Sequence, residues 1–288
     1  MRPTTDHLLA RARDATDMLR RCELCERRCA VDRIAGEPAP CGLGASSRCF
    51  KRHLSYAEEI DLIPSYMVYL AGCNFRCEFC VQAPTCFDPL RGELVHPGTL
   101  ANECLRQVDA GATTINLLGG EPSIHLHTIL ELAAAAPRHL PLILNSNFYM
   151  TPPVLDLLEG VVDIYLADFK FGNDACASRI ATVDRYVEVV TRNLLHAARQ
   201  RESGARLIVR HLLMPGHLEC CFRPVAAWMD AHLPDVPFHV MEGYVPAWRA
   251  ATSRRSPELA RTLDRADRAA ARGVMVQLGV SARRGACA

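Results

Sequence analysis

The sequence predicts an α/β fold in which a parallel sheet closes at least partly into a (β/α)6 barrel. From about Ser65 onward, six short runs rich in Val, Ile, Leu and Tyr alternate with runs that have helix-like features. The short runs are nearly continuous in apolar character, as expected for strands that are buried on both faces of a parallel sheet. Six β-α units in succession place the reactive groups at the carboxyl ends of the strands.

Turn residues set the limits of these elements. The predicted strands are Ser65–Ala71, Thr113–Leu118, Pro141–Ser146, Val161–Asp168, Arg206–Leu213 and Pro237–Gly243. The helices predicted between them are Thr99–Ala110, Leu126–Ala136, Pro152–Leu158, Thr182–Arg201 and Cys220–Leu233. Gly111 follows the first of these helices, and Pro137 and Pro234 follow the second and the last, as is typical of helix ends.

The alternation covers the middle of the chain and leaves a segment on either side. We expect a Cys-rich N-terminal extension over residues 1–55, the β-α core over 56–252 and a C-terminal segment over 253–288. In the C-terminal segment we expect one helix rich in Arg and Ala, followed by a short strand within the apolar stretch Val274–Val280.

The composition excludes several classes of protein. Because Lys+Arg 33 balance Asp+Glu 32 and no basic stripe occurs, nothing indicates a nucleic-acid partner. The apolar runs are too short to span a bilayer, and the polar start, Met1–Leu19, is unlike a signal peptide. The 14 cysteines include C-x2-C and C-x3-C spacings that suit metal ligation, so we expect reduced thiols in a cytoplasmic protein.

Three cysteines follow the first predicted strand with the spacing C-x3-C-x2-C: Cys73, Cys77 and Cys80. Thiolates this close on one loop can converge on a single soft metal centre. Structural zinc sites and fully ligated clusters use four protein ligands. Three thiolates therefore leave one iron of a [4Fe–4S] cluster open to another ligand. The alternatives are a zinc knuckle or three buried thiols.

Polar residues end the later predicted strands as well. The second strand is followed by Gly119-Gly120-Glu121-Pro122. The two glycines let a ligand approach the backbone closely, and the carboxylate of Glu121 can accept a hydrogen bond from an ammonium group. The alternative is a simple strand-to-helix turn, which would also use glycines. The other strand-end residues are Asn145, Ser146, Asn147, Asp168, Lys170, Arg210 and Met241. Polar side chains in apolar strands need partners. A pocket with a zwitterionic ligand would provide them, and the alternative is that Asp168 and Lys170 pair only with each other.

The run Cys73-x3-Cys77-x-Phe79-Cys80, followed by Gly119-Gly120-Glu121-Pro122 in a six-unit repeat, resembles the radical S-adenosylmethionine (SAM) superfamily. The resemblance implies a partial (β/α)6 radical-SAM barrel and a [4Fe–4S] cluster on the three cysteines. It also implies that S-adenosyl-L-methionine chelates the fourth iron through its amino and carboxylate groups. Reductive cleavage would then give a 5′-deoxyadenosyl radical that abstracts hydrogen from a substrate.

The same resemblance implies roles for the strand-end residues. The expected cofactor-binding residues are Phe79, Gly119, Gly120, Glu121, Asn145, Ser146, Asn147 and Met241. Phe79 would lie against the adenine, and a core aromatic is the alternative for it. The expected catalytic residues are Asp168, Lys170 and Arg210.

Within the superfamily, the chain most resembles the activating enzymes of glycyl radical enzymes, a branch typified by the pyruvate-formate-lyase-activating enzyme. The patterns Asp168-x-Lys170 and Arg210-x4-Pro215-Gly216 carry this resemblance. More narrowly, the N-terminal cysteines and Met241-x2-Tyr244-x-Pro246 resemble a pyruvate-formate-lyase-activase-like subgroup. They imply an oxidoreductase that acts on a glycine of a partner protein, with reduced flavodoxin or ferredoxin as the electron donor. The chain departs from the subgroup by having Leu62-Ile63-Pro64-Ser65 before the first strand and Val81-Gln82-Ala83 after the cysteines, which allows a changed substrate.

Two other functions stay open. One is the radical modification of a small molecule or peptide in cofactor or natural-product biosynthesis. The other, from a different class, is a non-catalytic Fe–S or zinc-binding protein that kept the fold. Such a protein would need neither the Gly-Gly-Glu-Pro turn nor the polar strand ends.

A second group of cysteines, Cys22, Cys25, Cys29 and Cys41, has four members and can close a metal site completely. Zinc and a second [4Fe–4S] cluster both suit four thiolates. The alternative is that some of the four are free thiols, because Cys49 and Cys86 lie nearby in the sequence and could take their places as ligands. The remaining cysteines lack ligand spacing and are expected to be apolar fillers or surface thiols: Cys104, Cys176, Cys220, Cys221 and Cys287.

Overall fold

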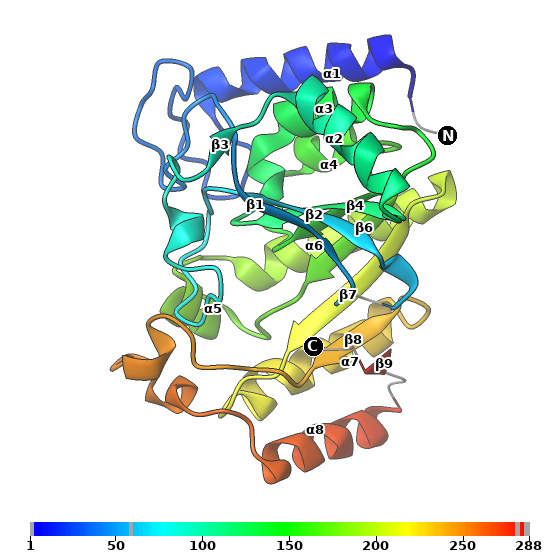
Figure 1. Ribbon diagram of the computed structural model, residues 1–288. Coiled ribbons are helices and arrows are strands. Elements are labelled where there is room, and N and C mark those ends of the chain that lie inside the picture. The colour runs from blue at the N-terminus through cyan, green and yellow to red at the C-terminus, as the bar shows by residue number, and fades with distance from the viewer. Residues whose placement is uncertain (1–2, 58–59, 280–282, 285–288) are drawn as a thin grey trace.

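The computed structural model describes residues 3–57, 60–279 and 283–284, and one nine-stranded sheet forms its centre (Figure 1). The strands are β1 Arg48–Ser55, β2 Ser65–Leu70, β3 Glu93–Leu94, β4 Thr114–Gly119, β5 Leu142–Ser146, β6 Ile164–Asp168, β7 Arg206–Leu212, β8 Phe238–Met241 and β9 Arg283–Arg284. Their order is β3-β1-β2-β4-β5-β6-β7-β8-β9. Neighbouring strands are parallel from β2 to β9, whereas β1 pairs antiparallel with β2 and with β3. The sheet is open, which confirms the predicted α/β fold with a partial barrel.

Helices occupy both flanks of the sheet. They are α1 Thr5–Asp17, α2 Pro97–Asp109, α3 Leu126–Ala135, α4 Pro152–Leu158, α5 Asp174–Ala181, α6 Tyr186–Arg199, α7 Arg223–His232 and α8 Arg265–Leu278. Strand β2 is buried along its whole length, as a central strand covered on both faces must be. None of the helices in the described part of the chain is both long and apolar enough to cross a membrane.

Three of the predicted element boundaries are wrong. The predicted helix Thr182–Arg201 starts too early, because Thr182 has a left-handed backbone that ends α5 and Arg185 has another that precedes α6. The helix predicted from Cys220 begins instead with a π-helical turn, Leu218–Phe222, which leads into α7. The apolar stretch at Val274 belongs to the end of α8 and is no strand, and Val280 lies outside the described residues.

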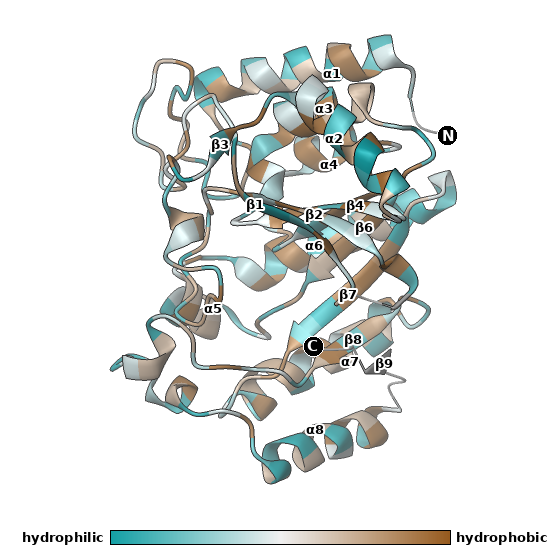
Figure 2. Ribbon diagram, in the orientation of Figure 1, coloured by the Kyte–Doolittle hydropathy of each residue, from teal (hydrophilic) through white to brown (hydrophobic). Residues whose placement is uncertain are grey.

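The N-terminal extension is joined closely to the core. Leu8, Ala12 and Ala15 recur on one face of α1 and are buried, and α1 packs on α3. The outward face of α1 is largely hydrophilic (Figure 2). At the end of the extension, β1 extends the sheet by pairing with β2.

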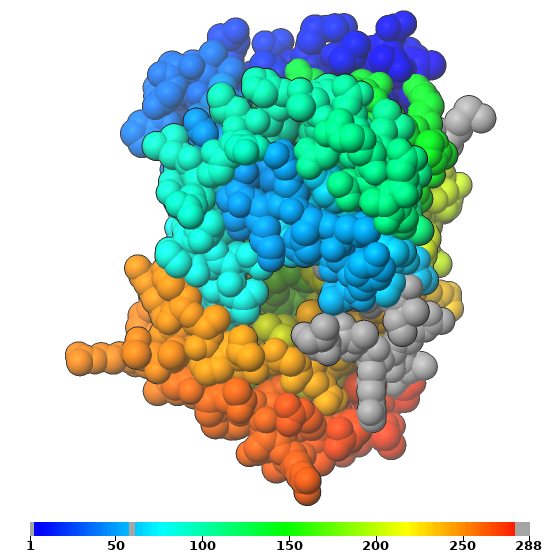
Figure 3. All heavy atoms as spheres, viewed as in Figure 1, coloured from blue at the N-terminus to red at the C-terminus, as the bar shows by residue number. Residues whose placement is uncertain are grey.

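The carboxyl ends of the parallel strands meet at one edge of the sheet, and loops from both halves of the chain surround that edge. In Figure 3 the surface is hollowed between the cyan segments above and the orange segment below, with green residues visible inside. The chain therefore brings the strand ends to an accessible concave region, where α/β folds bind their ligands.

Candidate active site

The cysteine loop, residues 72–88, follows β2 and is held by backbone hydrogen bonds at both ends. The N–H of Gly72 donates to the carbonyl of Cys86 at 2.8 Å. Those of Arg76 and Glu78 donate to the carbonyls of Ala181 and Ile180, both at 3.0 Å. These two carbonyls lie in the last turn of α5, where helical carbonyls have no partner within the helix. Helix α5 thus supports the loop from below.

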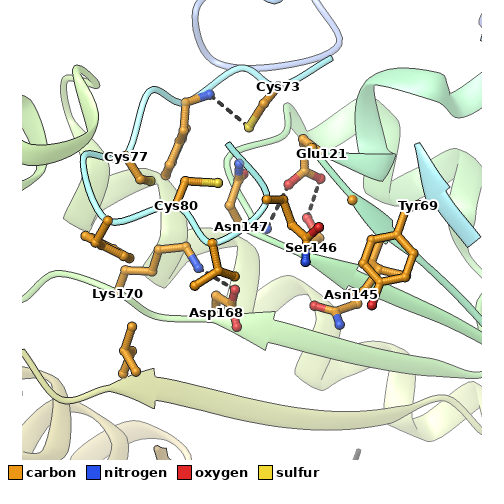
Figure 4. Close-up of a pocket in the computed structure, with 18 of the residues that line it drawn as sticks. Tyr69, Cys73, Cys77, Cys80, Glu121, Asn145, Ser146, Asn147, Asp168 and Lys170 are labelled. Carbon is orange, nitrogen blue, oxygen red and sulfur yellow. Dashed lines mark hydrogen bonds and ion pairs between the residues drawn. The ribbon is translucent and has the colours of Figure 1, made fainter. Parts of the chain in front are cut away.

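The three predicted ligands of the cysteine loop differ in burial. Burial raises the pKa of Cys77 to about 12, although the nearby cation of Lys170 opposes this effect. Burial also raises the pKa of Cys73, again well above the ordinary value. Cys80 is less buried, and its contact with Cys86, at 3.6 Å between the sulfurs, lowers its pKa to about 7. Figure 4 shows the three side chains above the strand ends.

Gly119 and Gly120 are required by the packing of β4 against β2 and the cysteine loop. Gly119 has φ +118, and a Cβ there would lie 2.4 Å from the nitrogen of Leu70. A Cβ on Gly120 would lie 1.8 Å from the carbonyl oxygen of Gly72. The sequence predicts a close approach to a ligand, and the structure adds a close approach of backbone to backbone that no side chain permits.

Glu121 lies at the centre of a buried hydrogen-bond network (Figure 4). Its carboxylate accepts from the Ser146 hydroxyl at 2.7 Å, from the Asn147 N–H at 2.8 Å and from the Ser123 N–H at 3.0 Å. Burial raises the pKa of Glu121 even though these hydrogen bonds oppose the shift. The network fixes the ends of β4 and β5 relative to each other.

Asp168 binds two cations at the end of β6. Its carboxylate contacts the ammonium of Lys170, and it accepts from Nε of Arg210 at 3.0 Å. Arg210 also donates to Oδ1 of Asn145 at 2.6 Å. Burial alone would raise the pKa of Asp168, but Arg210 and Lys170 lower it overall. The alternative in which Asp168 and Lys170 pair only with each other is therefore wrong.

One cavity of about 340 Å³ joins all of these groups. The sequence-predicted residues that line it are Cys73, Cys77, Phe79, Cys80, Gly119, Gly120, Glu121, Asn145, Ser146, Asn147, Asp168, Lys170, Arg210 and Met241. Val81 and Gln82 were noted only as departures that follow the cysteines, and sequence reasoning missed Tyr69, Phe75, Phe87, Leu118 and Leu212. Several of these are ordinary apolar strand or loop residues, and only the direction in which each side chain points identifies them as lining residues.

The N-terminal cysteines also come together. Cys22, Cys25 and Cys41 are buried and Cys29 is half-buried. Burial raises the pKa of Cys25 to about 12, and the neighbouring Cys41 and Cys22 add to the shift. Cys86, one of the two suggested substitutes for this set, contacts Cys80 of the cysteine loop instead.

A buried cation lies beside this N-terminal set. Arg33 is 1% exposed, and its Nη1 lies 3.8 Å from Sγ of Cys22. Its guanidinium donates to the carbonyls of Gly44 and Ile124, both at 2.9 Å, its Nη2 has no hydrogen-bond partner, and the ion pairs of the described residues include none with Arg33. A buried charge needs a counter-charge. Thiolates held by a metal would supply it, so this donor set fits a metal centre.

A third cysteine group is a finding that sequence spacing did not predict. Cys176, Cys220 and Cys221 were expected to be fillers or surface thiols, yet their sulfurs surround the imidazole of His217. Cys176 and Cys221 are buried and Cys220 is exposed, as fillers and surface thiols would be, but the three residues come from two distant segments that only the fold brings together. Cys104 is buried, as a filler would be, and Cys287 lies outside the described residues.

Comparisons with known proteins agree with this architecture. Residues 67–229 match the family model of the radical SAM superfamily. The uncharacterized protein MJ0674 of Methanocaldococcus jannaschii is 33% identical over 255 residues, which cover 86% of this chain and 72% of that protein.

Two solved structures are similar to part of this chain, and the first of them shares its fold. SuiB of Streptococcus suis, bound to its precursor peptide SuiA, has a TM-score of 0.53 at 13% identity over 73% of this chain. The methyltransferase TsrM of Kitasatospora setae, with tryptophan and a SAM analog bound, has a TM-score of 0.44 at 18% identity over 61% of this chain. The chain spans 45% of the length of SuiB and 35% of that of TsrM, so it corresponds to less than half of either enzyme.

Proposed function

This chain belongs to the radical SAM superfamily, whose cofactors are a [4Fe–4S] cluster and SAM, and we propose that it cleaves SAM reductively to abstract hydrogen from a substrate. The observation that carries the proposal is the single cavity that joins the cysteine loop to the ends of β4, β5, β6, β7 and β8. Its volume of about 340 Å³ lies in the range of ligand pockets, roughly 300–1,000 Å³.

Cys73, Cys77 and Cys80 would hold the cluster. In the described part of the chain, their sulfurs do not belong to any group of potential ligands whose atoms all lie within 4.8 Å of one another, as the ligands of a single ion would. A wider spacing suits a cluster that binds each thiolate at a different iron. When bound, the reduced cluster and SAM together supply cleavage of a C–S bond and the oxidising power for hydrogen abstraction. The cation of Lys170 lies near Cys77 and stabilises its thiolate form.

The other cavity residues would hold SAM and exclude water. Glu121 faces the cavity, and its carboxylate already accepts three hydrogen bonds. The ammonium group of SAM would supply the positive counter-charge that this buried carboxylate needs. We place the adenine against Phe79, whose ring packs near Phe171 and Tyr244. Met241 and the backbone of Gly119 would complete this wall.

Asp168, Lys170 and Arg210 would orient the reacting groups. The trio contains two cations and one anion, which leaves one positive charge in excess. That excess suits a carboxylate or an anionic cluster in the cavity, because a buried charge is stabilised only by an opposite partner. The guanidinium of Arg210, which comes from β7, donates to Asn145 of β5, and this hydrogen bond fixes its position.

For the substrate, we infer a glycine in a partner protein. The patterns Asp168-x-Lys170 and Arg210-x4-Pro215-Gly216 support this choice. A peptide or small molecule is the second candidate, because SuiB, which shares the fold, binds a precursor peptide. Reduced flavodoxin or ferredoxin is the proposed electron donor.

For the N-terminal cysteines we propose a structural metal site, holding zinc or a second cluster. In the described part of the chain their sulfurs, like those of the cysteine loop, do not belong to a group whose ligand atoms all lie within 4.8 Å of one another, and this wider spacing favours the cluster. The four thiolates of the site leave no open position, so a role in folding fits better than a role in chemistry. The guanidinium of Arg33 beside Cys22 would balance the negative charge of such a site.

The test is formation of 5′-deoxyadenosine. The full chain is reconstituted anaerobically with iron and sulfide, then incubated with SAM and a low-potential reductant. We expect 5′-deoxyadenosine and methionine from the unaltered chain and from Cys104→Ala, which removes a buried thiol of α2. Cys73→Ala should yield neither product. If the reconstituted chain binds iron but never cleaves SAM, the enzymatic proposal is refuted and a non-catalytic Fe–S protein takes its place.

A further inference from the structure

Four potential metal ligands outside the cavity converge on one point. Cys176 belongs to α5, whereas His217, Cys220 and Cys221 belong to the turn that follows β7. Their ligand atoms all lie within 4.8 Å of one another. We propose that these side chains form a Cys3His site for a zinc ion, separate from both cysteine groups recognised in the sequence.

The distances match tetrahedral coordination. Zinc binds sulfur at about 2.3 Å and nitrogen at about 2.0–2.1 Å, which places tetrahedral sulfurs about 3.8 Å apart and sulfur about 3.6 Å from nitrogen. In the structure, Sγ of Cys220 lies 3.8 Å from Sγ of Cys176 and 3.9 Å from Sγ of Cys221. Nδ1 of His217 lies 3.3 Å from Cys220 and 3.6 Å from each of the other two sulfurs. These sulfurs are far beyond the length of a disulfide bond, about 2.05 Å.

The surroundings of the imidazole supply a second, independent indication. Nε2 of His217 lies 3.0 Å from a carboxylate oxygen of Glu258, which in turn pairs with Arg179 at 2.8 Å. Zinc-binding histidines almost always donate their other ring N–H to such an acceptor, which fixes the tautomer and the ring orientation. Here that contact directs Nδ1 toward the three sulfurs.

The local backbone is shaped to bring these ligands together. The N–H groups of Cys221 and Phe222 both donate to the carbonyl of His217 at 3.1 Å, which widens the turn to a π-helix. Such turns are rare and recur at functional sites. On the other side, Gly172 lets the loop after β6 approach closely, because a Cβ there would lie 2.5 Å from the carbonyl oxygen of Cys221.

Asn173 connects the two segments. Its side-chain oxygen caps α5 by accepting from the N–H of Cys176 at 2.8 Å. Its amide donates to Sγ of Cys176 at 3.3 Å and to the carbonyl of Cys220 at 2.6 Å. Amide donors to cysteine sulfur stabilise the thiolate that a metal requires.

The site would be structural, since four protein ligands leave no open position. It joins the loop after β6 to the loop after β7, and the far end of α5 carries the carbonyls that support Arg76 and Glu78 of the cysteine loop. The zinc would thus hold α5 in the position from which it supports the cysteine loop (Figure 1).

Zinc content of the full chain tests the proposal directly. Purified protein is analysed by elemental mass spectrometry for the unaltered chain, Cys176→Ser, Cys221→Ser and the control Cys104→Ser. We expect both site variants to lose one zinc equivalent per chain and the control to lose none. Unchanged zinc in a folded Cys221→Ser protein overturns the proposal, and loss of iron and sulfide in place of zinc overturns the choice of metal.

A second variant keeps all four ligands, so that misfolding cannot decide the outcome. Glu258→Ala removes the partner of His217, and we expect zinc affinity, measured by competition with a chromophoric chelator, to fall about 10- to 100-fold. Glu219→Ala, which removes an exposed carboxylate of the same turn, should leave the affinity unchanged. Equal affinities in the two variants would contradict ligation by His217.

Discussion

The cysteine loop and the Cys3His cluster lie at opposite ends of α5, yet their ligands are arranged differently. The loop supplies three thiols within eight residues, and they face a cavity of about 340 Å³. The cluster supplies four ligands from two segments, and they face one another. Three ligands beside a cavity suit a centre that binds a further molecule, whereas four ligands without one suit a structural ion. Burial of the cysteines does not distinguish a catalytic centre from a structural one, whereas the number of ligands and the direction in which they point do.

The largest expected effect separates the two sites by their metals. Cys77→Ala should lose the iron of the cluster and all formation of 5′-deoxyadenosine, because one of three ligands is gone. Cys176→Ser should lose zinc and retain most of the iron. Iron, sulfide and zinc are measured in the same reconstituted samples. If both variants lost both metals together, the two sites would form one cooperative unit and the comparison would fail.

The next effect concerns the charges of the cavity. Arg210→Met leaves Asp168 with one cation fewer, and breaking a buried pair costs about 3 kcal/mol in the free energy of unfolding at neutral pH. The folded-state pKa of Asp168 lies below its ordinary value, so the pair stabilises the fold above that ordinary value and loses its effect as pH falls through the folded-state pKa. The difference between variant and parent should therefore shrink in acid.

Chemical denaturation across a range of pH measures this effect. Arg185→Met, which removes an exposed ion pair with Glu188, serves as the control and should change stability by less than about 1 kcal/mol. A loss in Arg210→Met that stays constant from neutral to acid pH would show that packing, and not charge, accounts for it.

A smaller effect follows from the contact between β4 and the cysteine loop. Gly120→Ala places a Cβ 1.8 Å from the carbonyl of Gly72, and forced overpacking of this kind costs about 1–3 kcal/mol. We expect reduced stability and weaker retention of iron, with zinc content unchanged. Gly98→Ala is the matched control, since no atom lies within 4 Å of the added Cβ. Equal behaviour of the two variants in denaturation would contradict the tight approach.

The smallest effect tests the link between the two sites through α5. Asn173→Ala removes a helix cap, which costs about 1 kcal/mol, together with the donor to Cys176. We expect weaker zinc binding and a modest fall in the rate of SAM cleavage. Thr4→Ala removes the corresponding cap of α1 and should cost similar stability without affecting either metal. A pure stability loss in both variants would argue against coupling through α5.

Much of the cavity could be predicted from sequence because its groups lie at strand ends. Residues such as Glu121 and Asp168 directly follow apolar runs, and parallel strands bring their carboxyl ends to one edge. The contact of Arg210 with Asn145 could not be predicted, because the two residues are 65 positions apart, no motif links them, and strand β6 lies between β5 and β7 in the sheet. The start of α6 was predicted too early because the left-handed residues Thr182 and Arg185 carry no glycine signal.

The sequence by itself determined the α/β fold, the family and the set of strand-end residues, because periodicity and short motifs are local properties. Only the tertiary structure decided which distant groups meet. Cys176 and Cys221 are 45 residues apart with unremarkable spacing, and they meet because β6 and β7 are neighbours whose following loops share one edge of the sheet. A metal site within one loop leaves a pattern in the sequence, whereas a site built across two loops depends on the positions that the sheet imposes.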